Sequence, residues 1–171
     1  EIGKLTNLSG LYLYDNEQGV EIRRKIKENQ YKFFIIHTFS HMLIREFEFS
    51  CGYPTASLKE RLYISNDPEY KMAGVLIYTT DGAEGSMGGI ISQTEPERLN
   101  KIINEAMQRA MNCSSDPLCW EAEGQGVFNA NLASCFSCSL VSETTCEEMN
   151  LGLDRRILVD QDFGFFKNSL I

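Results

Sequence analysis

The strongest apolar segment of the chain covers residues 31–49 and has the periodicity of a helix. Its large apolar side chains recur at helical spacing, namely Phe39, Met42, Leu43 and Phe47. Polar side chains follow another face at steps of four, four and three, namely His37, His41, Arg45 and Glu48. We therefore predict a helix over at least residues 37–49, ended by Gly52 and the following Pro54.

Further elements are predicted between residues 55 and 112. Residues 55–63 read as a second, short helix, and Asn66-Asp67-Pro68 as a turn. Residues 73–80 form a continuous β-branched and aromatic run, typical of a strand buried on both faces. After a glycine-rich loop at residues 81–89, Thr94 and Glu97 have the spacing of a capping box and begin a predicted helix that reaches Asn112. One face of it is apolar: Leu99, Ile102, Ile103, Ala106 and Ala110.

The ends of the chain are less regular. A short strand is predicted at residues 11–14, and residues 20–30 suit an edge strand or a surface helix. Thr145 and Glu148 offer another capping box, which places Cys146 in the first turn of a short helix. The expected fold is α/β or α+β, a small central sheet flanked by helices with a Cys-rich zinc-binding appendage. Residues 1–30 are expected to be an N-terminal extension, and residues 31–171 the domain itself, with its zinc site at 113–146.

Charge limits the function. The 171 residues carry a formal net charge of −8, and residues 113–150 hold six acids and no Lys or Arg. This argues against a free-standing nucleic-acid binder. Any nucleic-acid contact would use the basic side chains of residues 23–32, namely Arg23, Arg24, Lys25, Lys27 and Lys32. The alternative is that these side chains form an ordinary solvated helix face. No membrane span or secretory signal is predicted, and the missing initiator methionine indicates a processed product or, as we favour, a piece of a longer protein.

Five of the six cysteines lie between residues 113 and 146. Cys135 and Cys138 form a C-x2-C pair, which lets two thiolates reach one zinc ion from a tight turn. Cys113, Cys119 and Cys146 compete for the two remaining places, and the predicted helix start would favour the Cys146 thiolate. A closed, structural Zn²⁺ in an intracellular, cytoplasmic protein is the resulting hypothesis. Unrelated buried cysteines or a redox C-x-x-C pair are the alternatives.

A second group of residues suggests a pocket. His37 and His41 have the i, i+4 spacing of two imidazoles that share a metal, but the glutamate of a zincin motif is absent between them. They are either hydrogen-bonded histidines of a half-buried helix or part of a pocket with the glycine-rich loop. The residues of that candidate pocket would be His37, His41, Arg45, Arg61, Asp81 and Glu84. The loop itself is either a plain turn or an anion site. No residue is assigned a catalytic role.

Several motifs together resemble a known family. They are H-T-F-S-H-M-L-I at 37–44, the segment C-G-Y-P-T-A-S-L-K-E-R-L-Y at 51–63, L-I-Y-T-T-D-G-A-E-G-S-M-G-G at 76–89, C-S-S-D-P-L-C at 113–119, and the Cys-rich segment at 135–156. Over residues 31–160 the chain resembles the C-terminal domain of DrmB, the helicase-partner subunit of DISARM phage-defence systems. Similar zinc-containing domains end superfamily-2 helicases of the mitomycin-repair type.

The resemblance implies an accessory domain in bacterial DNA processing that contacts a superfamily-2 helicase, as a subunit or a domain. DNA would be reached through that partner or through the basic run at 23–32. It also implies that the family's cysteine positions are Cys113, Cys119, Cys135, Cys138 and Cys146. It implies no catalytic activity for the domain by itself. An enzyme built on the His37 and His41 pocket is the alternative.

Overall fold

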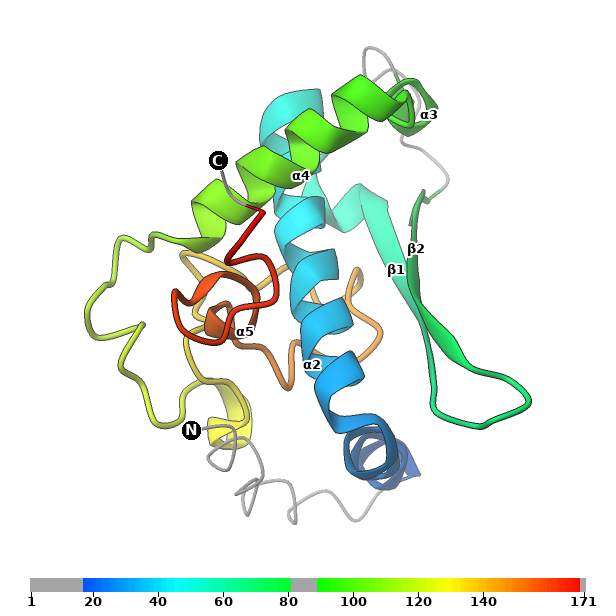
Figure 1. The fold of residues 1–171 in the computed structure, drawn as a ribbon, viewed down its shortest axis with the longest axis vertical. Helices are drawn as coiled ribbons and strands as arrows, with labels where there is room; N and C mark the ends of the chain where they lie inside the picture. Colours follow the sequence, from blue (N-terminus) through cyan, green and yellow to red (C-terminus); the bar gives the residue numbers. More distant parts are fainter. Residues whose placement is uncertain (1–16, 81–88, 170–171) are drawn as a thin grey trace.

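A single long helix, α2 (Glu17–Cys51), is the axis of the molecule in the computed structural model, which describes residues 17–80 and 89–169 (Figure 1). The predicted helix at 37–49 is confirmed, and it continues upstream through residues 17–30, which are helical rather than an edge strand. Gly52 ends it with a φ of 72°, and its N–H donates to the carbonyl of Glu48 at 3.2 Å. The strand predicted at residues 11–14 lies outside the described residues.

A two-stranded antiparallel sheet lies beside α2. After the short 3-10 turn η2 (Thr55–Ser57), strand β1 (Leu58–Ser65) pairs with β2 (Met72–Thr79), in a register that sets Leu58 opposite Thr79. The prediction of a helix at residues 55–63 is therefore wrong. In β1, Leu58, Glu60 and Leu62 are buried and alternate with more exposed residues, which is the period of a strand. The charges at 59–61 conceal this alternation in the sequence.

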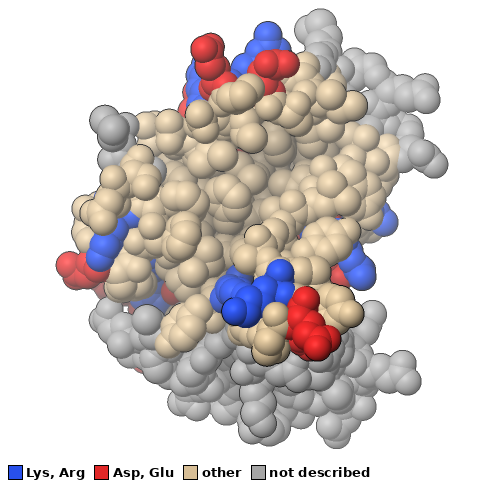
Figure 2. Space-filling model, turned by 45° about the vertical axis from the view of Figure 1, so that its right-hand side comes forward, with Lys and Arg blue, Asp and Glu red and all other residues tan. Residues whose placement is uncertain are grey.

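Strand β2 occupies the predicted position, but it is not buried on both faces. With only two strands, the sheet has one face against α2 and leaves the other open. On the side of the molecule turned forward in Figure 2, uncharged surface predominates and the charged side chains form separate clusters. The register also places Lys59 and Arg61 on the open face of the sheet. We call this open face the outer sheet face; its large apolar members are Tyr63, Met72, Leu76 and Tyr78.

Helix α4 (Pro96–Ala110) follows the short α3 (Gly89–Ser92) and crosses α2 (Figure 1). This confirms the predicted helix, although Thr94 does not cap it. The Thr94 hydroxyl instead donates to the carbonyl of Ile91 at 2.7 Å, and Glu95 is the N-cap. The face turned to α2 is buried through Ile102, Ala106, Met107 and Ala110.

The last third of the described chain is mostly turns. Its regular elements are η3 (Val127–Asn129) and α5 (Arg156–Val159). The helix predicted to begin at Cys146 is wrong, because residues 147–150 form turns and Met149 and Asn150 have φ of 53° and 58°. A right-handed helix cannot contain such φ values, so the Cys146 sulfur gains nothing from a helix dipole.

One apolar core joins these parts, formed where α2 meets α4, α5 and β1. Phe33, Phe34 and Ile44 of α2, Met107 of α4 and Leu158 of α5 have no exposed surface. The expected class, a small sheet with helices and a Cys-rich region towards the C-terminus, is confirmed; the antiparallel pairing fits α+β. Within residues 17–80 and 89–169, no helix combines the length and apolar character that crossing a bilayer requires.

Candidate metal centres

Four of the predicted cysteines converge just beyond the end of α4. The sulfurs of Cys113, Cys119, Cys135 and Cys138 all lie within 4.8 Å of one another. The Sγ–Sγ distance is 3.5 Å between Cys113 and Cys135, and 3.8 Å from Cys138 to both Cys119 and Cys135. A tetrahedron of sulfurs about 2.3 Å from a central zinc has edges of about 3.8 Å. The four side chains therefore have the spacing of a closed zinc site.

Turns and polar contacts hold these sulfurs in place. The backbone N–H of Cys138 and of Ser139 both donate to the carbonyl of Cys135, at 3.2 and 2.9 Å, and close the C-x2-C turn. The Asp116 carboxylate accepts from the N–H of Cys113 at 2.8 Å. The side-chain amide of Gln125 donates to Cys119 Sγ at 3.5 Å, and the Ser139 hydroxyl to Cys138 Sγ at 3.2 Å. Such donors orient metal-bound thiolates and stabilise their charge.

The sulfurs differ in acidity. Burial raises the pKa of Cys119 to about 12. Burial also opposes ionisation of Cys135, but hydrogen bonds with Cys113 and with the backbone of Ser137 outweigh it and lower its pKa to about 6. The Cys135 thiol thus loses its proton more readily than the Cys119 thiol. A divalent cation among the four would favour the thiolate form of all of them.

A buried arginine that was not predicted as a site residue lies beside this cluster. Arg155 donates to the carbonyl of Ala110 at 2.9 Å and to the Asp116 carboxylate, and its guanidinium lies 4.8 Å from the centre of the Trp120 ring. Burial opposes its charge, but Asp116 and the sulfurs of Cys138 and Cys119 outweigh burial and raise its pKa. Arg155 thus offsets part of the negative charge that four thiolates would bring.

Cys146 does not join the other four cysteines. Its sulfur lies 3.2 Å from Nε2 of His37, in a second group that also holds His41 and Glu60. Burial raises the pKa of Cys146 well above its ordinary value and lowers that of His37. The two histidines outweigh burial at Glu60 and lower its pKa. Glu60 was not predicted to be a member of this group. The one signal that could have identified it is the alternation of a strand over residues 58–62, which puts Glu60 on the same face as Leu58 and Leu62.

The residues of the predicted pocket lie apart. His37 and His41 are fully buried, whereas Arg61 extends from the outer sheet face and pairs with Glu147 at 2.9 Å. Within the described residues, Arg45 makes no hydrogen bond with either histidine and donates to the carbonyl of Leu140 at 3.0 Å. Asp81 and Glu84 lie outside the described residues. The described structure therefore brings together the two histidines but adds neither arginine to them.

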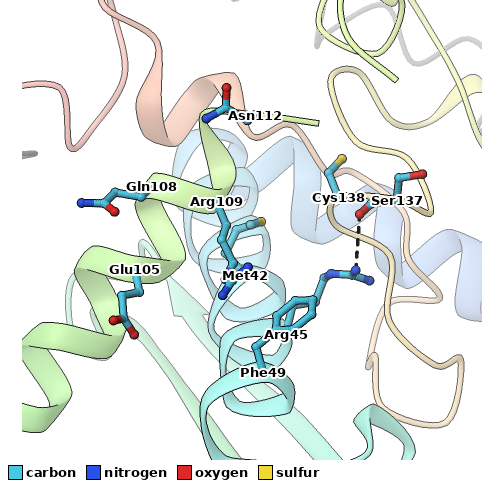
Figure 3. Close-up of a pocket in the computed structure, with 9 residues that line it drawn as sticks. All are labelled: Met42, Arg45, Phe49, Glu105, Gln108, Arg109, Asn112, Ser137 and Cys138. Carbon is cyan, nitrogen blue, oxygen red and sulfur yellow. Dashed lines mark hydrogen bonds between the residues drawn. The ribbon is translucent and has the colours of Figure 1, made fainter. Parts of the chain in front are cut away.

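An open groove of about 640 Å³ lies between α2, α4 and the C-x2-C turn (Figure 3). Its two arginines are already engaged. Arg45 donates to the carbonyl of Ser137 at 3.3 Å, while Arg109 pairs with the buried Glu46 at 2.5 Å and lies 4.2 Å from the ring centre of Phe49. The groove therefore presents few uncommitted charges to a ligand.

Comparison with known proteins agrees with this geometry. A family model described as the MrfA Zn-binding domain matches residues 39–139, which include all four converging cysteines. The chain is also 37% identical over 168 residues to the DISARM protein DrmB of Bacillus paralicheniformis. That alignment covers 95% of this chain and 29% of the relative, so the chain spans less than a third of the protein it resembles. The family match and the four-cysteine cluster together support a structural zinc.

Proposed function

Because the chain belongs to the MrfA Zn-binding domain family, we propose that it is a zinc-stabilised, non-enzymatic accessory domain of a DNA-processing anti-phage defence or repair protein. Its role in this proposal is to contact a superfamily-2 helicase, which is a separate subunit or another domain. DNA is reached through that partner. The observation that carries the proposal is the tetrahedral spacing of four cysteines in a chain related to DrmB.

In the proposal the zinc ligands are Cys113, Cys119, Cys135 and Cys138. Four sulfurs fill the coordination of zinc and leave no position for water or substrate, as is typical of structural sites. The ion would join the end of α4 to the turns that follow it. Its purpose is to hold this irregular segment against α2, since the segment has little regular secondary structure of its own.

We place the helicase contact on the outer sheet face. Tyr63, Met72, Leu76 and Tyr78 are each between 41% and 48% exposed there, an apolar group that a protein partner can cover. Hot spots of protein interfaces favour such aromatic and large apolar side chains. A helicase is the occupant we favour, since the related protein belongs to the DISARM group and the resemblance in sequence is to a helicase partner.

The charge distribution limits direct contact with DNA. The net charge is −8, and residues 113–150 contain no Lys or Arg. The basic run at residues 23–27 lies within the first turns of α2, and Lys32 further along already donates to the carbonyl of Ser65 at 3.0 Å. We therefore assign the DNA contact to the partner, to which this chain would contribute the start of α2.

No reaction is proposed for the chain. His37 and His41 are fully buried, and Arg61 lies on the opposite face of β1 from Glu60, which contacts them. A substrate would need to reach these groups together. An active site that used both histidines and Arg61 would require the core between α2 and β1 to open.

The test is co-purification with the helicase encoded beside this protein. We expect the chain to retain the helicase, Leu76→Glu to abolish retention, and Leu118→Glu to leave it unchanged. Leu118 is a suitable control because it is 82% exposed and lies far from the sheet in sequence. Each variant should unfold at the wild-type temperature, so that a loss of binding reports the surface. Failure of both the chain and any longer protein that contains it to retain the helicase would refute the proposal.

A further inference from the structure

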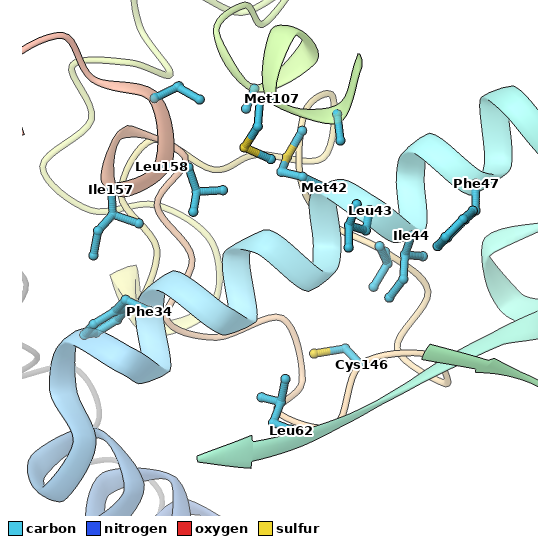
Figure 4. Packing of buried hydrophobic residues seen from close by; sticks show 14 of the residues in the cluster. Phe34, Met42, Leu43, Ile44, Phe47, Leu62, Met107, Cys146, Ile157 and Leu158 are labelled. Atoms are coloured by element: carbon cyan, nitrogen blue, oxygen red, sulfur yellow. The ribbon is translucent and has the colours of Figure 1, made fainter. Parts of the chain in front are cut away.

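We propose that the chain carries a second metal centre, in which His37, His41, Glu60 and Cys146 hold one zinc ion. The group joins α2 to the inner face of β1 and to the turn after residue 145. All four ligand atoms lie within 4.8 Å of one another. Figure 4 shows Cys146 in the space between α2 and β1, beside Leu62. This centre is independent of the four-cysteine cluster and of the proposed helicase contact.

The distances fit the edges of a coordination tetrahedron. Nε2 of His37 lies 3.2 Å from Sγ of Cys146 and 3.3 Å from Oε1 of Glu60, and Nε2 of His41 lies 3.5 Å from that same oxygen. Zinc bonds of about 2.0–2.1 Å to nitrogen or oxygen and about 2.3 Å to sulfur give N–O edges of about 3.4 Å and N–S edges of about 3.5 Å. The four atoms therefore surround a space of the right size.

The hydrogen bonds show which atoms face that space. Nδ1 of His41 lies 3.0 Å from the carbonyl of Ser139, so in a neutral ring it carries the proton and donates. The Nε2 lone pair then points towards Glu60 Oε1, which is also an acceptor. Two acceptors 3.5 Å apart in a buried place repel each other unless a cation lies between them. A backbone carbonyl that accepts from the far nitrogen is the usual support of a metal-bound histidine.

Unpaired atoms of the same cluster point to a missing partner. Within the described part of the chain, His41 Nε2 and Glu60 Oε2 are buried and make no hydrogen bond. Buried polar atoms in folded proteins are nearly always paired. A zinc ion bound to Nε2 of His41 and to the Glu60 carboxylate would satisfy both.

Two backbone donors face the Cys146 sulfur and would stabilise it as a thiolate once a cation offsets the cost of its burial. The sulfur accepts hydrogen bonds from the backbone N–H of Glu148 at 3.3 Å and of Asn150 at 3.1 Å. The turn that aims these donors requires positive φ at Met149 and Asn150, a conformation that costs side-chain-bearing residues free energy. Donors to a sulfur favour its charged form. A buried thiolate needs a cation, and a zinc ion would supply one.

The charges balance. One Glu60 carboxylate and one Cys146 thiolate carry two negative charges, which equal the charge of Zn²⁺. Such a neutral centre is compatible with burial, and its members are at most 8% exposed. Full burial leaves no open coordination position, so the proposed role is structural, namely to fasten the sheet and the 145–150 turn to α2. The family match at residues 39–139 includes neither His37 nor Cys146, so it does not already describe this site.

The competing explanation is a proton in place of the metal. An imidazolium at His41 would pair with Glu60, and Cys146 would remain a thiol. The two explanations differ in metal content and in the atoms around the metal. A metal at the second centre raises zinc from one to two ions per chain. It also lowers the mean sulfur coordination, because five sulfurs and three nitrogen or oxygen atoms are then shared by two ions.

The experiment measures zinc per chain by elemental analysis, and the zinc ligands by X-ray absorption, on chain purified from zinc-supplemented cells. We expect two zinc ions with an average of about 2.5 sulfurs each, given the five-sulfur set of the two clusters. One zinc with four sulfurs in the wild type would overturn the proposal outright, and this measurement needs no variant to fold.

Two variants with matched controls then locate the second ion. Cys146→Ser and Glu60→Gln should each lower the content to one zinc bound by four sulfurs. Cys51→Ser and Glu48→Gln change the same residue types outside both clusters and should keep two ions. If Cys146→Ser retains two ions with an unchanged sulfur average, the assignment is wrong. Loss of helicase retention alone would leave this proposal standing, since it concerns a different surface.

Discussion

Gly152 provides a quantitative test of how the irregular C-terminal segment packs against α2. Its φ is 75°, and an added Cβ would lie 2.8 Å from Cε1 of Phe33 and 3.1 Å from Cε1 of Phe34. Both rings are fully buried in the core. They contact each other edge to face with centroids 5.6 Å apart, so neither can move without disturbing the other. Gly152→Ala should therefore be costly for two separate reasons.

The two costs can be separated with Gly52, which ends α2. Gly52 has a similar φ of 72°, but an added Cβ would meet nothing within 4 Å. Gly52→Ala should lose about 1 kcal/mol of unfolding free energy, the cost of a left-handed conformation for alanine. Gly152→Ala should lose that amount and a further ~1–3 kcal/mol for overpacking a closed core.

Urea unfolding of the zinc-loaded chain measures both losses. We expect lower midpoints with unchanged m-values, and a larger shift for Gly152→Ala than for Gly52→Ala. A difference of about 1–3 kcal/mol is the contribution of the two rings, because the backbone term is common to both variants. Equal losses would refute the reasoning, since they would mean that the 151–153 segment is not fixed against Phe33 and Phe34.

Three other outcomes are expected. Removal of zinc by a chelator, or Cys138→Ser, should lower the free energy of unfolding by more than ~4 kcal/mol, whereas Cys51→Ser should be nearly neutral; calorimetry of the metal-loaded proteins would show this. Arg155→Met should cost ~3–5 kcal/mol in urea unfolding, because it leaves the Asp116 carboxylate without its cationic partner. Leu158→Ala should cost ~2–5 kcal/mol by the same measurement, since Leu158 is fully buried, and a loss below 1 kcal/mol would place α5 outside the core.

The helices were predictable because their apolar residues repeat with one period. In α4, Ile102, Ala106 and Ala110 fall on one face, and burial follows that face. The hairpin was predicted only in part. At β1, the charged residues Lys59, Glu60 and Arg61 resemble a helix surface, although the middle one is buried between a half-buried and an exposed neighbour. A buried charge of this kind depends on its partners in α2, which local sequence does not reveal.

The cysteines also show that local sequence does not reveal tertiary partners. The C-x2-C spacing of Cys135 and Cys138 predicts a shared metal because the turn is local. The separation of Cys146 from the other four follows from a turn with positive φ at Met149 and Asn150. Neither is glycine, and Asn150 alone, although asparagine is enriched at positive φ, does not predict that turn. Whether a cysteine joins one cluster or another is therefore set by tertiary packing rather than by spacing.

The contacts of α2 also determine when the chain can fold during its synthesis. The hydroxyl of Thr38 accepts from the N–H of Asp154 at 3.2 Å, and His41 contacts the carbonyl of Ser139, so this helix is paired with the last third of the described chain. At a translation rate of about 5–20 residues per second, the face of α2 that packs on this last third would emerge from the ribosome some 5–20 seconds before it. During that interval Phe33 and Phe34, which pack against Gly152, lack that part of their cover and are available to chaperones.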